Sequence, residues 1–247
     1  MMDRRTLLAS LGAWSVGSPA WSFGEKTQVN ILELDLGQGT ESRPRAWKQL
    51  LYEAQQTTSV DCGVRVERAA PADPRLFDFP FATVVVTDGF ARPPGKALEQ
   101  LSQYLSYGGF LLLDDASGGD GAAKSAIDDL VTHLFPTRPL SALPREHSIH
   151  RSFFLVDRPL GRTDRAAWLE GVMLGNLTPV VVMRDDLSGA LDRRSDGRPV
   201  NACVPGGDWQ RKEATKLAIN LLMYSLTANY KLDQAHVRQL MREGRLE

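Results

Sequence analysis

The sequence has few cysteines, almost no net charge and no long apolar segment, and each scarcity excludes a class of protein. Two cysteines in 247 residues, Cys62 and Cys203, are too few for a disulfide framework, although one bridge between them stays open. A formal net charge of −1 gives no global basic field to attract nucleic acid or an anionic membrane surface. The local pair Arg193-Arg194 is interpreted as part of a solvated loop. No apolar segment reaches the roughly 20 residues that span a bilayer, so no transmembrane span is predicted.

The length and the hydrophobic content favour one folded domain. With 43% hydrophobic residues, the chain can bury a sizeable core. We find no internal repeat, no low-complexity tract and no linker that divides the chain into halves. We therefore predict a single α/β domain over residues 25–247, ending in C-terminal helices.

Residues 1–24 have the organisation of an export signal. Arg4 and Arg5 form a charged start, residues 7–16 are apolar, and residues 18–20 (Ser-Pro-Ala) offer a small-residue cleavage site. The paired arginines before the apolar stretch resemble a twin-arginine signal. We expect export, to the periplasm or elsewhere outside the cytoplasm. A short uncleaved anchor is the alternative, so cleavage and membrane association stay open.

The rest of the sequence is organised around residues 98–119. Leucines at helical spacing predict a helix, Gly108-Gly109 ends it, and residues 110–113 form an unbroken apolar run that leads to Asp114 and Asp115. A strand that is apolar on both faces is typical of a parallel sheet covered by helices on both sides. We predict an α/β fold with a three-layer, doubly wound, mostly parallel sheet.

The same periodicities predict the other elements. The expected strands are residues 29–36, 64–68, 81–87, 169–176 and 179–183, and the expected helices are 45–56, 121–134, 208–227 and 232–242. A turn at 177–178 joins the last two strands, and residues 188–205, rich in Gly, Asp, Arg and Pro, are predicted to be a long surface loop. Gly37-Gln38-Gly39 resembles part of a dinucleotide-binding motif, but Ser42 replaces its third glycine. A plain strand-to-helix turn is therefore favoured, and no cofactor is predicted.

Polar residues at the predicted strand ends mark a candidate site. Parallel sheets of this kind bind ligands just past the carboxyl ends of their strands. Arg151 is expected to reach this edge by pairing with Asp114 or Asp115, because a guanidinium grips a carboxylate at two points; direct contact with a ligand is the alternative. We predict a ligand-binding or partner-binding edge formed by Asp88, Asp114, Asp115, Ser117 and Arg151.

Two kinds of chemistry at the same edge are alternatives. Ser117, in Asp-Ala-Ser-Gly-Gly, stands where a nucleophilic serine would stand on a sharp turn, with His133, His147 or His150 as its base. A structural role in the turn is the simpler interpretation of Ser117. The three aspartates with His147 or His150 would suit a metal ion, but the favoured interpretation is that one acid of the pair is a strand-end residue hydrogen-bonded to loop amides.

Several stretches, in order, resemble the bacterial family called domain of unknown function 4159. They are PFATVVVTDGF, LSQYLSYGGFLLLDDASGG, LFPTRPLSALPREHSIHRSFFLV, LEGVMLGN, RDDLSGAL and CVPGGDWQRKEATKLAINLLMYSLTANYKLDQAHV, and the resemblance extends over residues 29–242. It implies a fold similar to class I glutamine amidotransferases, which carry a nucleophilic cysteine on the turn after a strand. The turn after Leu113 has no cysteine, so no catalytic residue is transferred. We expect an exported, non-catalytic binding or accessory module of the bacterial cell envelope, with a hydrolase as the alternative.

Overall fold

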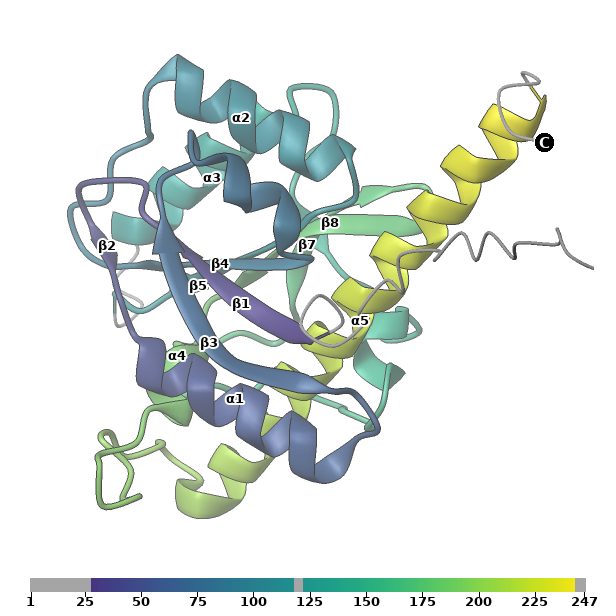
Figure 1. Cartoon of the computed structure of the whole chain (residues 1–247). Helices are drawn as coiled ribbons and strands as arrows, with labels where there is room; N and C mark the ends of the chain where they lie inside the picture. Colours follow the sequence, from purple (N-terminus) through teal and green to yellow (C-terminus); the bar gives the residue numbers. More distant parts are fainter. Residues whose placement is uncertain (1–27, 118–121, 243–247) are drawn as a thin grey trace, which may run out of the picture.

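The computed structural model describes residues 28–117 and 122–242. Side chains are described for residues 28–117 and 123–227. The predicted export signal lies outside them. The strands in the described part are β1 (Val29–Leu34), β2 (Thr40–Glu41), β3 (Cys62–Ala69), β4 (Phe81–Val86), β5 (Phe110–Asp115), β6 (Ser141–Ala142), β7 (Glu170–Leu174) and β8 (Leu177–Met183). They form one sheet in the order β3-β1-β4-β5-β8-β7-β6, with β2 paired to β4 (Figure 1).

The sheet is mixed but mostly parallel, which confirms the α/β class. Strands β3, β1, β4, β5 and β8 run parallel, whereas β7 is antiparallel to β8 and β6 is antiparallel to β7. Helices α2 (Gly95–Ser106) and α3 (Ala122–Leu134) cover one face, above the sheet in Figure 1. Helices α1 (Pro44–Thr57), α4 (Leu187–Leu191) and α5 (Gly207–Arg242) cover the other face.

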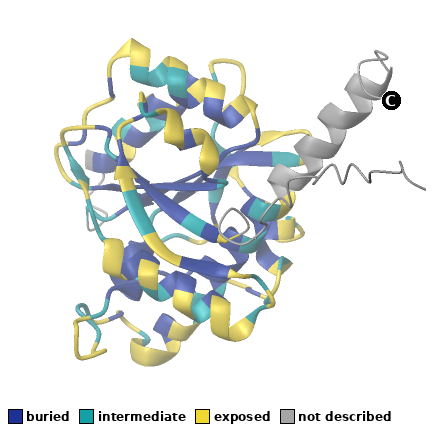
Figure 2. Cartoon of the chain, viewed as in Figure 1, coloured by how far each residue is buried: buried dark blue, intermediate teal, exposed yellow. Residues whose placement is uncertain are grey.

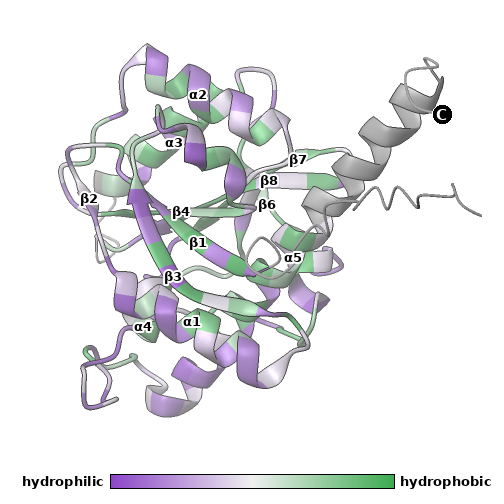
Figure 3. Cartoon of the chain, viewed as in Figure 1, coloured by the Kyte–Doolittle hydropathy of each residue, from purple (hydrophilic) through white to green (hydrophobic). Residues whose placement is uncertain are grey.

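Strand β5 is the interior strand that its unbroken apolar run predicts. It lies between β4 and β8, and all its residues are buried (Figure 2). Its side chains alternate between two cores, with Phe110 and Leu112 packing toward α1 and α5, and Leu111 and Leu113 toward α2 and α3. Each buried leucine contributes about 1.5–3 kcal/mol. The central strands are correspondingly apolar along most of their length (Figure 3).

Three predictions about the second half of the chain are wrong in detail. Residues 187–191 form the buried helix α4 and not the start of a surface loop, because Asp186 caps it by accepting a hydrogen bond from Gly189 N at 2.9 Å. The two predicted C-terminal helices are one helix, α5, since residues 229–231 contain neither Gly nor Pro to end it. The turn between β7 and β8 lies at residues 175–176, not 177–178.

Both cysteines are buried free thiols, so they form no disulfide. Burial raises the pKa of Cys62 to about 11. Within the described part of the chain, no helix is both long and apolar enough to cross a bilayer.

The Gly37-Gln38-Gly39 segment folds the chain back over the sheet. After β1, it leads into β2, whose Thr40 and Glu41 pair with Val86 and Val85 of β4. Gly39 packs so closely against the turn after β4 that a Cβ there would lie 2.2 Å from Phe90 Cα. The glycine therefore serves a close backbone contact, and β2 pairs with β4 beyond the residues of β4 that pair with β1.

Two glycines of this turn provide a matched test. Gly37 and Gly39 have φ of +96° and +73°, but only Gly39 has backbone atoms in the space of a Cβ. We expect Gly37→Ala to lower the free energy of unfolding by about 1 kcal/mol through backbone strain. Gly39→Ala should lower it by about 3 kcal/mol or more, because the clash adds to the strain. Urea denaturation measures both, and equal losses would contradict the close contact.

Candidate functional site

The two acids at the end of β5 point to opposite faces of the sheet. Side chains alternate along a strand, so Asp114 continues the face of Leu112 and Asp115 continues that of Leu113. Asp114 is fully buried beside α4, and Asp115 faces the side covered by α3. The predicted single cluster is therefore two separate environments at one edge.

Asp114 holds the start of α4. Its Oδ1 accepts a hydrogen bond from Leu187 N at 2.7 Å, and its Oδ2 accepts one from Ser188 N at 2.8 Å. Both N–H groups belong to the first turn of α4, where no carbonyl of the helix can accept them. The side chain thus joins the central strand to the segment that follows β8.

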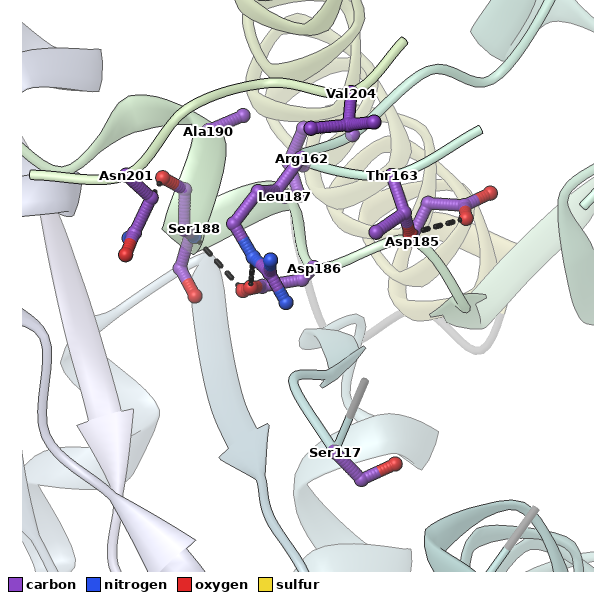
Figure 4. A network of polar contacts seen from close by, with 12 residues as sticks. Ser117, Arg162, Thr163, Asp185, Asp186, Leu187, Ser188, Ala190, Asn201 and Val204 are labelled. Carbon is purple, nitrogen blue, oxygen red and sulfur yellow. Dashed lines mark hydrogen bonds and ion pairs between the residues drawn. The ribbon is translucent and has the colours of Figure 1, made fainter. Parts of the chain in front are cut away.

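Asp186 belongs to a buried ionic network on the same face, and Figure 4 shows its contact with Arg162. Its Oδ1 lies 2.6 Å from Arg43 Nη1, and its Oδ2 accepts a hydrogen bond from Arg162 Nε. Arg43 also donates to Ser188 Oγ at 3.2 Å. Asp186 has a left-handed backbone (φ 54°), the one positive φ at a non-glycine residue in the described part. Such strain persists only where surrounding contacts fix it.

Burial gives Asp114 an unusual ionisation. Loss of hydration and, next, the negative charge of Asp186 raise the pKa of Asp114 to about 7, against the hydrogen bonds from Ser188 and the charge of Arg43. Arg43 is also paired with Glu41 Oε2 at 3.0 Å, so two arginines face three acids when all of these groups are ionised. Each side chain of this network contacts protein groups, so the network serves to hold these segments of the chain together.

Asp115 and Ser117 lie on the other face. Asp115 Oδ1 accepts hydrogen bonds from the Ser117 hydroxyl at 2.6 Å and from Ser117 N at 3.1 Å. In Figure 4, Ser117 lies apart from the ionic network of Asp186. Arg184, one residue past β8, places its Nη1 4.0 Å from Asp115 Oδ2.

A cavity of about 370 Å³ opens beside Asp115 and Arg184. We refer to it as the Asp115 cavity; it is lined by Asp115, Lys124, Arg165, Ala166, Ala167, Trp168, Glu170 and Arg184. Arg184 Nη2 is fixed by Asp128 at 2.6 Å and Glu170 at 2.7 Å, whereas its buried Nη1 has no hydrogen-bond partner in the described structure. Trp168 is 55% exposed.

Asp185 fixes the wall of this cavity. Its carboxylate accepts hydrogen bonds from Thr163 Oγ1 at 2.7 Å, Arg165 N at 2.9 Å and Ala166 N at 2.9 Å. Figure 4 shows the Thr163 contact. The backbone that carries Arg165 and Trp168 is therefore held in place before any ligand binds.

The structure separates Arg151 from the other predicted residues. Arg151 belongs to the 3-10 helix η2 (Ser148–Arg151), and its Nη2 donates to Glu146 O at 2.5 Å. The adjacent His147 contacts Thr178 at the start of β8, so η2 lies at the opposite edge of the sheet. The expected pairing of Arg151 with Asp114 or Asp115 is wrong. Asp88 is exposed in the turn after β4, at the predicted edge.

The three histidines proposed as bases lie away from Ser117. His147 Nε2 is 2.9 Å from Thr178 Oγ1, His150 is buried beside it in η2, and His133 Nδ1 is 2.8 Å from Asp129 O. Among the described residues, no three His, Cys, Asp or Glu side chains are grouped so that they could hold a metal ion. Asp114 and Asp115 point to opposite faces of the sheet, so they cannot both bind one metal ion as the alternative prediction requires.

The ionisation of Asp114 predicts a pH-dependent stability. Its folded pKa of about 7 exceeds the ordinary 3.8, so its contribution is complete below about pH 4 and is lost as the pH rises to about 7. Between pH 5 and 7 this term lowers the free energy of unfolding by at most about 1.4 kcal/mol per pH unit. Denaturation curves of Asp114→Asn should lack that slope, and Asp115→Asn is the matched control. Parallel curves for wild type and Asp114→Asn would contradict the shift.

Comparison with known proteins places the chain in a family. A search among curated proteins finds no match. A family model described as a domain of unknown function, DUF4159, matches residues 28–226. The match includes all strands of the sheet, both acids of β5 and the ionic network around Asp186. Because it covers most of the sequence, the chain belongs to the family described as a domain of unknown function (DUF4159).

Proposed function

We propose that the chain is a non-catalytic binding module, exported to the bacterial cell envelope, that holds a small ligand or a partner's side chain in the Asp115 cavity. One observation carries the proposal: the cavity at the carboxyl edge of the sheet is lined by Arg184, whose Nη1 has no hydrogen-bond partner among the described residues. Parallel α/β sheets bind ligands at this edge. The volume, about 370 Å³, is within the usual range for small-molecule sites.

The lining indicates the chemistry of the ligand. Lys124 and Arg184 are paired with Asp128 and Glu170, whereas Arg165 forms no ion pair among the described residues, so the cavity offers one uncompensated cation to an anionic group. A carboxylate oxygen that contacts Arg184 Nη1 would supply the hydrogen bond that the protein does not. The half-exposed Trp168 offers a flat apolar surface beside it. An aromatic carboxylate, free or at the end of a peptide, combines both features.

Binding is a better match than catalysis for the polar groups at this edge. The Ser117 hydroxyl is engaged by Asp115, and no described histidine contacts it. The parallel sheet with helices on both faces supports the proposed relation to the class I glutamine amidotransferase fold. On this relation, Asp115-Ala116-Ser117 would correspond to the turn on which that fold carries its cysteine. A hydrolase that uses Ser117 is the alternative.

A pair of matched ligands tests the site. We expect benzoate to quench Trp168 fluorescence saturably and benzamide, which lacks the charge, to bind at least 10-fold more weakly. Arg184→Lys keeps the charge beside Glu170 but removes Nη1, and should weaken benzoate binding about 5-fold or more. Arg138→Lys, at an exposed arginine outside the cavity, is the control. Equal affinity for the two probes, or for wild type and Arg184→Lys, would contradict the proposal.

Export is tested separately from binding. If Arg4 and Arg5 form a twin-arginine signal, replacing both with lysine should leave most of a C-terminally tagged protein in the cytoplasm. Immunoblots of cell fractions measure the distribution. Unchanged export of the Arg4→Lys/Arg5→Lys variant would remove the support for this route.

A further inference from the structure

A second cavity lies on the opposite face of the sheet, between α1 and α5. Its volume is about 580 Å³. We refer to it as the basic groove; its charged lining residues are Glu53, Arg193, Asp208, Arg211, Lys212 and Lys216. The apolar residues Phe154, Pro199 and Ile219 complete its wall. None of these residues belongs to the Asp115 cavity or to the ionic network of Asp114.

The groove contains a buried cation that no carboxylate neutralises closely. The Arg211 side chain is only 6% exposed. Its Nη1 donates to Ala190 O and its Nη2 to Asn201 O at 2.5 Å, and both acceptors are neutral carbonyls. The carboxylate paired with Arg211 is that of Asp208. Asp208 Oδ1 lies 3.9 Å from Arg211 Nε, and the Asp208 side chain is 90% exposed. A buried charge without a close counter-ion favours the binding of an anion.

The other cations of the groove add to this field. Arg193 and Arg211 each have a buried Nε without a hydrogen-bond partner in the described structure. Among the described residues, Arg193 and Lys212 form no ion pair, and Lys216 pairs with Glu213 at 2.7 Å. Four cations and two acids line the groove, and Glu213 beside it removes one further charge. The groove is therefore positive although the chain as a whole is not.

We propose that the basic groove binds an organic phosphate. A guanidinium matches two oxygens of a phosphate, and a phosphate monoester carries about −1.5 to −2 charges at pH 7. Its oxygens offer acceptors to Arg193 Nε and Arg211 Nε, which have no hydrogen-bond partner among the described residues. Its carbon part packs against Phe154, Pro199 and Ile219, which bare phosphate cannot do. Phosphate monoesters occur both on soluble metabolites and as lipid head groups. The groove recognises the phosphate monoester, whichever of the two carries it.

Calorimetric titration of the full chain tests the groove with defined probes. We expect phenyl phosphate to bind at least 10-fold more tightly than inorganic phosphate, because only it contacts the apolar wall. Arg193→Gln and Lys212→Gln should each weaken phenyl phosphate binding about 5-fold or more. Lys48→Gln removes the same charge from an exposed position of α1 outside the groove and should leave binding unchanged. Neither Arg193 nor Lys212 holds another element by an ion pair, so both variants should fold.

Vesicles distinguish the two sources of the phosphate. If the protein binds phenyl phosphate and also binds phosphatidic-acid vesicles but not phosphatidylcholine vesicles, the proposal is supported and the ligand is assigned to a lipid head group. Phenyl phosphate binding without vesicle binding supports a soluble metabolite. The proposal is overturned if phenyl phosphate does not bind at millimolar concentration. It is also overturned if Lys48→Gln weakens binding as much as the groove variants do. Benzoate binding in the Asp115 cavity uses other residues, so the two proposals fail independently.

Discussion

The buried contacts of Asp114 with the start of α4 and of Asp186 with two arginines hold the carboxyl edge together. Asp114 binds the first two N–H groups of α4, and Asp186 binds Arg43 at the start of α1 and Arg162 in the loop after η2. One set of charges thus joins the central strand, two helices and a loop that are distant in sequence. Burying ions is costly, so such a network stabilises the fold only when every member has its partner, and loss of one typically costs about 3–5 kcal/mol. The left-handed backbone of Asp186 is tolerated because these contacts fix it from both sides.

The pleat of β5 then assigns different roles to two adjacent acids. Asp114 faces the helices α1 and α4 and is consumed by internal contacts, whereas Asp115 faces the side on which a cavity remains open. After β8 the alternation of a strand no longer holds. Arg184 lines the Asp115 cavity, whereas Asp186, two residues later, has a left-handed backbone and belongs to the buried network. Polar residues at the ends of β5 and β8 therefore form the buried network on one face of the sheet and line the cavity on the other face.

The sequence predicts the parts of this arrangement that follow from local pattern. The apolar run of β5, the β-branched run of β4 and the periodicity of α1 and α3 give the strands, the helices and the α/β class. The pattern also places Asp114, Asp115 and Ser117 at the carboxyl end of β5, where the structure has them. It does not find Arg43, Arg162 or Asp186, because their pairing joins segments more than 20 residues apart. It hides α4, since Gly, Asp and Arg around that short helix read as loop, and it misplaces Arg151, because nothing local indicates at which edge a long connection lies.

Helix α4 contacts both Asp114 of the central strand and Arg211 of the basic groove. Asp114 holds its first N–H groups, and Arg211 of the basic groove binds the carbonyl of Ala190 near its end. The helix has five residues, too few to be stable alone, so its position depends on these two contacts and on its burial between α1 and α5. The basic groove and the carboxyl edge of the sheet therefore share one short buried helix, which Asp114 binds at its start and Arg211 binds near its end.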